Sequence, residues 1–177
     1  MDSAKISISK ASTADIDQLE LISCKTFYEA FASENTEDDM QKYLEESFNQ
    51  QKLLKELNNN TSAFYFISIE DKKVGYLKVN SSAGQSELKT DNSLEIERIY
   101  ILQEFQGQRL GQALVDKAIE IARKMACDFV WLGVWEKNLK AIEFYKRNGF
   151  VEFDKHVFVL GNDVQTDLMM KRELNAI

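Results

Sequence analysis

The spacing of apolar residues changes between a strand-like and a helix-like period along the first third of the chain. Residues 5–12, KISISKAS, alternate between apolar and polar, which predicts a strand. Helical spacing follows from about Thr13 to Ala32, with one apolar face formed by Ile16, Leu19, Ile22, Phe27 and Phe31. Ser12 with Asp15 three residues later resembles a capping box, so the helix is expected to begin there.

Two shorter helices and a hairpin are predicted next. Thr36 with Asp39 opens the second helix, which carries the apolar residues Met40, Tyr43, Leu44 and Phe48. A third helix covers about Gln50 to Leu57 and stops in NNNTS. AFYFISI (residues 63–69) and VGYLKV (74–79) then indicate two strands joined by the polar turn EDKK, while residues 81–93 have the most loop-like composition.

The second half of the chain contains one β–α–β crossover. LEIERIYIL (residues 94–102) predicts a strand, Leu110 to Met125 a helix, and FVWLGVW (129–135) a short buried strand. A short helix over 139–148 is followed by Gly149 as its C-cap, and two closing strands surround LGNDVQ (160–165). Without repeats or a linker, this order predicts a single mixed α/β (α+β) domain over residues 1–177.

Composition and charge narrow the classes of function. The formal net charge is −7 over 177 residues, which argues against nucleic acid as a partner and permits a cationic small molecule. Cys24 and Cys127 are far apart, and a lone histidine, His156, cannot build a zinc site, so no metal is expected. No apolar run reaches the roughly 18 residues of a membrane span. The N-terminus lacks the apolar core of a secretory signal, so no membrane partner and a cytoplasmic location are expected.

Two glycines stand where the strand 94–102 gives way to the next helix. The first N–H groups of a helix lack intrahelical partners and lie at the positive end of its dipole. Gly107 removes a side chain just before these N–H groups, and Gly111 follows one turn later, so an anion could bind there. Neither the NTPase P-loop pattern nor the dinucleotide pattern G-x-G-x-x-G fits. The glycines alone therefore leave two readings open, an anion site or a tight structural turn.

QEFQGQRLGQALV followed by VWLGVWEKNLKAIEFYKRNGFVEF resembles the GCN5-related N-acetyltransferase (GNAT) family. Its acyl-CoA signature is [RQ]-x-x-G-x-[GA], followed by a strand and a short helix with an N-x-x-A-x-x-x-Y-like pattern. Gln106 and Gly111 match the ends of the signature, whereas Arg109 stands where the family usually has glycine. Further similarity in IERIYIL, WLGVWEKN, AIEFYKRNGF and QTDLMM is greatest to the PaiA-type spermidine/spermine acetyltransferases.

The resemblance implies a fold and a co-substrate. The expected fold is a mixed, mostly antiparallel, twisted sheet of about seven strands with four or five helices, splayed between strands four and five. Acetyl-CoA would enter this splay, with its pantetheine beside the backbone of Ile99, Tyr100 and Ile101. The resemblance places the pyrophosphate on the segment Gln106, Gly107, Gln108, Arg109, Leu110 and Gly111. Asn138, Ala141 and Tyr145 would line the thioester end from one face of their helix.

Candidate catalytic residues follow from the chemistry of amide formation from a thioester. Tyr145 matches the family's general acid, which gives a proton to the CoA sulfur. Glu97, expected on the same strand face as Ile99 and Ile101, could take the amine proton, and Glu95 is the alternative base. Glu97 could instead be a structural partner of Arg98 or Lys78.

The sequence is therefore interpreted as an acetyl-CoA-dependent enzyme that acetylates a primary amine by direct transfer. The favoured acceptor is a polyamine such as spermidine or spermine. Another amine, such as a protein N-terminus, an antibiotic or an amino acid, is the first alternative. A non-catalytic module that senses acyl-CoA or a polyamine is the second. A homodimer is possible. The carboxylates expected to hold a cationic acceptor are Glu29, Glu34, Glu37, Asp38, Asp39, Glu87 and Asp91.

Overall fold

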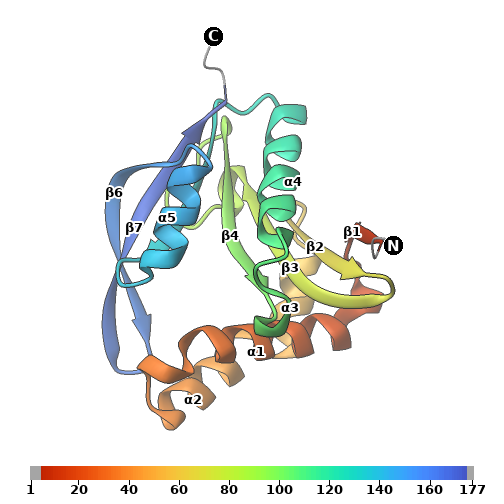
Figure 1. Ribbon diagram of the computed structural model, residues 1–177, viewed down its shortest axis with the longest axis vertical. Coiled ribbons are helices and arrows are strands. Elements are labelled where there is room, and N and C mark those ends of the chain that lie inside the picture. The colour runs from red at the N-terminus through yellow and green to blue at the C-terminus, as the bar shows by residue number, and fades with distance from the viewer. Residues whose placement is uncertain (1–4, 175–177) are drawn as a thin grey trace.

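The computed structural model describes residues 5–174, which form a seven-stranded sheet in the order β1-β2-β3-β4-β5-β7-β6 (Figure 1). Residues 1–4 and 175–177 of the predicted domain lie outside the described residues. The strands are β1 (Ile6–Lys10), β2 (Ser62–Ile69), β3 (Lys72–Ser81), β4 (Ser93–Ile101), β5 (Phe129–Trp135), β6 (Val151–Leu160) and β7 (Asp163–Glu173). The α-helices are α1 (Ile16–Phe31), α2 (Glu37–Ser47), α3 (Gln50–Leu57), α4 (Leu110–Lys124) and α5 (Leu139–Arg147). The predicted order of elements is confirmed.

The helix starts follow the caps expected from the sequence. The backbone N–H of Ser12 donates to the Asp15 carboxylate at 2.9 Å, although residues 13–15 form a 3₁₀ turn and the α-helix begins at Ile16. Thr36 caps α2 by accepting from the N–H of Asp39 at 3.2 Å. These side chains satisfy N–H groups that have no partner within the helix, so polar residues fix where each helix begins.

Helices cover both faces of the sheet and give the molecule two cores. Helices α4 and α5 pack on one face, where the core includes Leu77, Leu114, Ala118, Leu132 and Ile142. Helices α1, α2 and α3 pack on the other, where it includes Leu19, Phe27, Met40, Leu53 and Phe64. In Figure 1, α4 and α5 lie in front of the sheet, while α1 and α2 run below it.

The sheet opens between its only parallel pair of strands in the described residues. β4 pairs with β5 only over Ser93 to Ile96 on β4 and Phe129 to Leu132 on β5. Beyond that point the two strands continue to Ile101 and Trp135 without pairing to each other. The predicted splay is therefore present. It leaves the inner backbone edge of each strand without a strand partner, so an extended ligand can hydrogen-bond there.

A β-bulge on β4 changes which side chains face the splay. Lys78 pairs with Arg98 while Val79 pairs with Ile96, so Glu97 is the additional residue. A bulge of this kind bends its strand and interrupts the alternation of side chains. Ile99 packs in the core beneath α4, whereas Tyr100 packs against the core beneath α1.

Candidate active site

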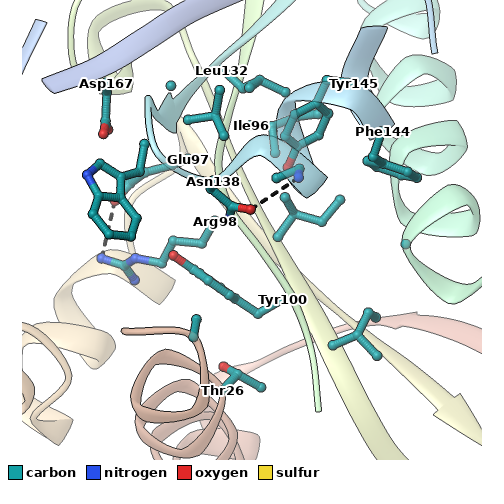
Figure 2. Close-up of a pocket in the computed structure, with 18 of the residues that line it drawn as sticks. Thr26, Ile96, Glu97, Arg98, Tyr100, Leu132, Asn138, Phe144, Tyr145 and Asp167 are labelled. Atoms are coloured by element: carbon teal, nitrogen blue, oxygen red, sulfur yellow. Dashed lines mark hydrogen bonds and ion pairs between the residues drawn. The ribbon is translucent and has the colours of Figure 1, made fainter. Parts of the chain in front are cut away.

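A cavity of about 1210 Å³ lies at the splay and is lined from both faces of the sheet. Its walls come from α1, α2, β4, β5, the start of α4, α5 and the β6–β7 hairpin. Figure 2 shows Tyr100, Arg98 and Glu97 of β4 between Thr26 of α1 and Tyr145 of α5. The structure brings into this one cavity the predicted residues Glu95, Glu97, Ile99, Tyr100, Ile101, Gln106, Gly107, Arg109, Leu110, Gly111, Asn138, Ala141 and Tyr145. Gln108 lies in the same turn but is not part of the cavity lining.

The turn before α4 has the geometry of an open backbone cradle. Gly107 has φ +83°, and a Cβ built on it would meet no heavy atom within 4 Å. The position therefore demands glycine for its backbone conformation and leaves free space above the turn. The open turn comes directly before α4, whose first N–H groups have no partner within the helix, so this position could hold an anionic group such as a diphosphate.

Arg109 departs from the family pattern and adopts the backbone conformation that glycine would take. It stands immediately before α4 with φ +61° and ψ 13°, in the left-handed region. A residue with a Cβ is strained there by roughly 1 kcal/mol or more. The departure thus keeps the shape of the turn while adding a cation to the cavity wall.

Helix α5 carries three of the predicted residues, and one of them also holds the helix start. The side-chain oxygen of Asn138 accepts the N–H of Ala141 at 3.1 Å, so Asn138 is the N-cap of α5 (Figure 2). Asn138 and Ala141 are thereby fixed against each other at the cavity wall. Tyr145, two turns into α5, lines the cavity with a side chain that is 8% exposed.

Burial raises the pKa of the Tyr145 phenol well above its usual value, so the hydroxyl is protonated at neutral pH. No hydrogen bond from this hydroxyl to another described residue is present. The ring is held by edge contacts with Phe144 and Phe150, at centroid distances of 5.3 and 5.8 Å. A rigid phenol with a free proton can act as a hydrogen-bond donor or acid towards a bound ligand.

Glu97 lies on the opposite face of the sheet from that predicted. The prediction placed it with Ile99 and Ile101, but the bulge turns its carboxylate towards side chains on the α1 side. Oε2 of Glu97 lies 2.6 Å from Nζ of Lys78, and Oε1 lies 3.2 Å from Nη2 of Arg98. Asn80 also donates to Oε2 at 2.5 Å. The prediction of a shared face is wrong, because β4 contains one residue more than the β3 segment with which it pairs.

The same contacts make Glu97 an ion-pair partner. Burial alone would raise the pKa of its carboxyl, but Arg98 and Lys78 together outweigh burial and hold the pKa below its usual value. Both cations also bind Glu56 of α3, at 2.9 Å for Arg98 and 3.3 Å for Lys78. The Glu97 carboxylate, which forms ion pairs with two cations and accepts a hydrogen bond from an amide, is therefore a weak proton acceptor.

Glu95 has the opposite environment on the same face. Its carboxylate is 3% exposed and accepts from Asn80 Nδ2 at 3.0 Å, from the Ser86 N–H at 2.8 Å, and from the Ser86 hydroxyl. All of these donors are neutral. Burial raises the pKa of Glu95, and the bonds from Ser86 and Asn80 only partly offset this. Glu95 is therefore the better proton acceptor of the two carboxylates.

An aromatic wall and a histidine–aspartate pair complete the side of the cavity beyond the splay. Phe31 of α1 faces Trp135 of β5, with ring centroids 6.2 Å apart. Asp167 of β7 lies beside His156 of β6, with Nε2 of His156 3.7 Å from the carboxylate. Burial raises the pKa of Asp167, which His156 partly lowers. A Cβ on Gly133 would lie 3.0 Å from His156, so the glycine makes room for this pair.

Sequence reasoning missed Asn80, Ser86 and Asp167. Ser86 and Asp167 line the cavity, and Asn80 lies behind its wall as a donor to Glu95 and Glu97. The one signal for Asp167 was its place in QTDLMM, a segment similar to the PaiA-type enzymes. For Asn80 and Ser86 the local sequence carried no signal.

Most of the carboxylates expected to hold the acceptor lie elsewhere. Of the seven, only Glu87 lines the cavity. Glu29 accepts the N–H of Gln103 at 2.8 Å, and Glu37 accepts the Tyr28 hydroxyl at 2.9 Å. Asp39 accepts the N–H of Asn162 at 3.4 Å, which ties α2 to the turn between β6 and β7. The cavity instead presents Glu95, Glu97 and Asp167.

The described residues contain neither a metal-binding cluster nor a membrane-spanning helix. Within residues 5–174, no group of three or more His, Cys, Asp or Glu side chains is placed to hold a metal ion. Nor does any helix in that part of the chain have the length and apolar character needed to cross a membrane.

Comparison with known proteins gives consistent similarities. The profile of the acetyltransferase (GNAT) family matches residues 24–150. An uncharacterized N-acetyltransferase from Lactobacillus delbrueckii subsp. lactis is 40% identical over 169 residues, which are 96% of this chain and 98% of that protein. The spermidine N(1)-acetyltransferase of Thermoplasma acidophilum is 25% identical over 146 residues, 82% of this chain and 88% of that protein. The crystal structure of the PaiA N-acetyltransferase of T. acidophilum with coenzyme A superimposes with a TM-score of 0.79 at 21% identity, covering 96% of this chain and 99% of that one.

Proposed function

Because the chain belongs to the acetyltransferase (GNAT) family, we propose that it transfers the acetyl group of acetyl-CoA to a primary amine of a polyamine such as spermidine or spermine. The family, the fold and the enzyme class, an N-acetyltransferase, agree with the sequence predictions. Acetyl-CoA is the acyl donor of enzymes in this family. The polyamine acceptor and the role of each residue are the proposal.

The observation that carries the proposal is the separation of charges around the cavity. Arg109 before α4, with Lys140 and Arg147 of α5, supplies cations beside the open backbone turn, where a diphosphate would lie. The α1 side presents Glu87, Glu95, Glu97 and Asp167. Since Lys78 and Arg98 are shared between Glu56 and Glu97, the carboxylates of this side exceed its cations. One end therefore suits an anionic donor and the other a cationic acceptor.

Binding of the donor is assigned to backbone and to small residues. The inner edge of β4 at Ile99, Tyr100 and Ile101, left without a strand partner by the splay, would pair with the pantetheine. The segment from Gln106 to Gly111 would hold the pyrophosphate, and Ala141 with Asn138 would border the thioester. A backbone N–H near Ile99 would polarise the acetyl carbonyl.

The acid and base are assigned by environment. Glu95 would take a proton from the attacking amine, directly or through water, since its pKa is raised and its donors are neutral. Glu97 remains the alternative base, but its ion pairs suit it to holding β4 and neighbouring side chains in place. As the amine nitrogen bonds to the carbonyl carbon and the carbon–sulfur bond breaks, Tyr145 would give its proton to the sulfur.

The aromatic wall favours a flexible cation. Phe31 and Trp135 line the cavity near Asp167, and Nζ of Lys137 lies 5.8 Å from the Trp135 ring centroid, so these rings suit an ammonium group beside the Asp167 carboxylate. A polyamine can place one amine at the thioester while a second, protonated amine lies among these groups. The relative from T. acidophilum is named as a spermidine acetyltransferase, and its similarity along most of the chain supports this acceptor.

The experiment is a comparison of acceptors with acetyl-CoA, measured by thiol release. We expect kcat/KM for spermidine to exceed that for a monoamine of similar length and that for a peptide N-terminus, and KM for spermidine to rise with salt. A higher value for the monoamine or peptide, or a KM independent of salt, would overturn the polyamine acceptor and leave the acetyltransferase. No turnover with any amine would favour a sensing module. The cytoplasmic location and the homodimer stay predictions.

A further inference from the structure

We propose that Ser86 is a positioning residue, locked in place by the buried side chain of Gln85, that fixes the Glu95 carboxylate at the wall of the cavity. Both residues belong to the β3–β4 loop (residues 82–92), to which the function proposed above assigns only the carboxylate of Glu87. The inference rests on that function in one respect only, that Glu95 is the base. The loop then becomes part of the catalytic apparatus of the domain.

The β3–β4 loop is anchored to the core by one amide side chain. Gln85 is 1% exposed, and its Oε1 accepts from Nε1 of Trp131 at 2.7 Å and from Oγ of Ser93 at 2.8 Å. Its Nε2 donates to the backbone oxygen of Thr90 at 2.7 Å, which closes the loop on itself. Buried polar groups satisfied on both sides hold a single geometry, because any movement leaves one of them without a partner.

The anchor lies directly beside the carboxylate that it serves. Trp131 of β5 is the cross-strand partner of Glu95, at the second-last pairing before the two strands diverge. Trp131 is fully buried, so the position of its Nε1 is set by core packing. The core of β5 therefore determines where Gln85 lies, and Gln85 determines where the next residue, Ser86, lies.

Ser86 holds both oxygens of Glu95. Its backbone N–H donates to Oε2 at 2.8 Å, and its hydroxyl donates to Oε1. Two donors from one residue fix the plane of a carboxylate, not only its distance. Asn80 adds a third bond, to Oε2 at 3.0 Å. With only neutral donors, the carboxylate is oriented without being neutralised, and it keeps its capacity to take a proton.

Among the described residues, no cation forms an ion pair with Glu95 itself. Glu97 and Arg98 lie on its own strand, Lys78 on β3, Glu56 on α3, Glu87 in the loop, and His156 and Asp167 on β6 and β7. Lys78 and Arg98 are both bound to Glu56 and Glu97, while Glu97 itself raises the pKa of Glu95. Hydrogen bonds from Ser86 are the largest influence opposing burial. Loss of the Ser86 hydroxyl should therefore raise the pKa of Glu95.

The test measures the titration of Glu95 directly, by carbon-13 NMR of labelled glutamate carboxyls assigned with Glu95→Gln. In Ser86→Ala we expect the Glu95 pKa to rise by about 0.5 to 1 pH unit, the effect of one lost hydrogen bond. Ser86→Thr keeps the hydroxyl and should restore the wild-type titration. Ser81→Ala is the matched control: it removes a hydroxyl that donates to the Thr61 backbone at 3.3 Å, near the same loop, and should leave Glu95 unchanged.

Gln85→Ala tests the anchor. Like Ser86→Ala, it should raise the Glu95 pKa, and it should also speed hydrogen exchange of the Ser86 amide. If Gln85→Ala does not fold, the Ser86 variants decide the test. An unchanged Glu95 titration in Ser86→Ala overturns the proposal, whatever the enzyme acetylates. Failure of the proposed function is separate: the NMR shift would then appear while thiol release is absent with every amine. If both hold, kcat for acetyl transfer should fall about 5- to 50-fold in Ser86→Ala and recover in Ser86→Thr.

Discussion

Nζ of Lys78 lies 2.6 Å from Oε2 of Glu97, in an ion pair whose lysine side chain is 5% exposed. The pair forms because the bulge on β4 places Glu97 on the α1 face of the sheet, where Lys78 of β3 lies. As a result, the two acidic residues of β4 have different surroundings. Glu97 joins the Lys78–Arg98–Glu56 ion-pair cluster, while Glu95 is left with neutral donors at the cavity wall.

The first prediction contrasts these two carboxylates in steady-state kinetics. Glu95→Gln should lower kcat by roughly 10²-fold or more, because an amide cannot take the proton of the amine. Glu97→Gln should lower kcat by less than about tenfold, since Glu95 keeps its place and its bonds from Ser86. Thiol release with saturating acetyl-CoA measures both. The reverse ranking would assign the base to Glu97.

Tyr145→Phe tests the general acid. The phenol carries its proton at neutral pH, and burial, which raises its pKa, keeps it protonated at higher pH, so Tyr145→Phe takes away a proton that the leaving sulfur needs. We expect kcat to fall by roughly 10²-fold while the affinity for CoA, measured by calorimetry, stays within about twofold. Tyr100→Phe is the matched control, because the phenol of Tyr100, on β4, also lines the cavity. Near-normal turnover of Tyr145→Phe when chemistry limits the rate would refute the assignment.

Much of the fold could be predicted because its signals are local. The caps at Ser12 and Thr36 mark helix starts, and Gly149, which follows the C-cap Asn148 with φ +81°, marks the end of α5; each signal lies in residues a few positions apart. The Gly107 turn is likewise local, since its positive φ belongs to one residue. The hairpin turn between β2 and β3 was predicted too long, because Lys72 and Lys73 already belong to β3.

The details of the site could not be predicted, because they depend on pairing between distant segments. The bulge at Glu97 exists only relative to β3, and a strand's own alternation contains no sign of it. Asp167 reaches the cavity by lying opposite Trp135, and Ser86 by the bond from Gln85 to Trp131. The acidic residues of the first helices do not line the cavity for the same reason, since Glu29 and Asp39 bind the distant backbone at Gln103 and Asn162.

Gly107→Asp tests the site for the diphosphate. A carboxylate placed over the open turn would repel an anion and would also require a strained φ of +83°. We expect CoA affinity in calorimetry to fall by at least about 2 kcal/mol. Gly107→Ala carries the backbone strain without the charge and separates the two effects. Equal affinity of the Asp and Ala variants, with the fold intact by circular dichroism, would rule out an anion at this turn.

The last prediction concerns the dependence of stability on pH. The pKa of Glu97 is lowered in the folded protein, so its ionised form contributes stability that is present above the unfolded pKa, about 4.3. That contribution is lost as the pH falls through the lower, folded pKa. Glu97→Gln lacks it at every pH, and at pH 7 we expect the variant to be less stable by about 1–3 kcal/mol, since removal of one partner leaves buried cations under-compensated.

The difference between wild type and Glu97→Gln should therefore shrink from pH 7 to pH 3, as measured by urea unfolding at fixed ionic strength. The control is Glu120→Gln, which removes a carboxylate bound to the exposed Lys124 on the surface of α4 and should change stability little at any pH. A difference that stays constant with pH would mean that folding does not lower the pKa of Glu97. The ion-pair cluster would then not be what separates Glu97 from Glu95, and the assignment of Glu95 as the base would lose its electrostatic support.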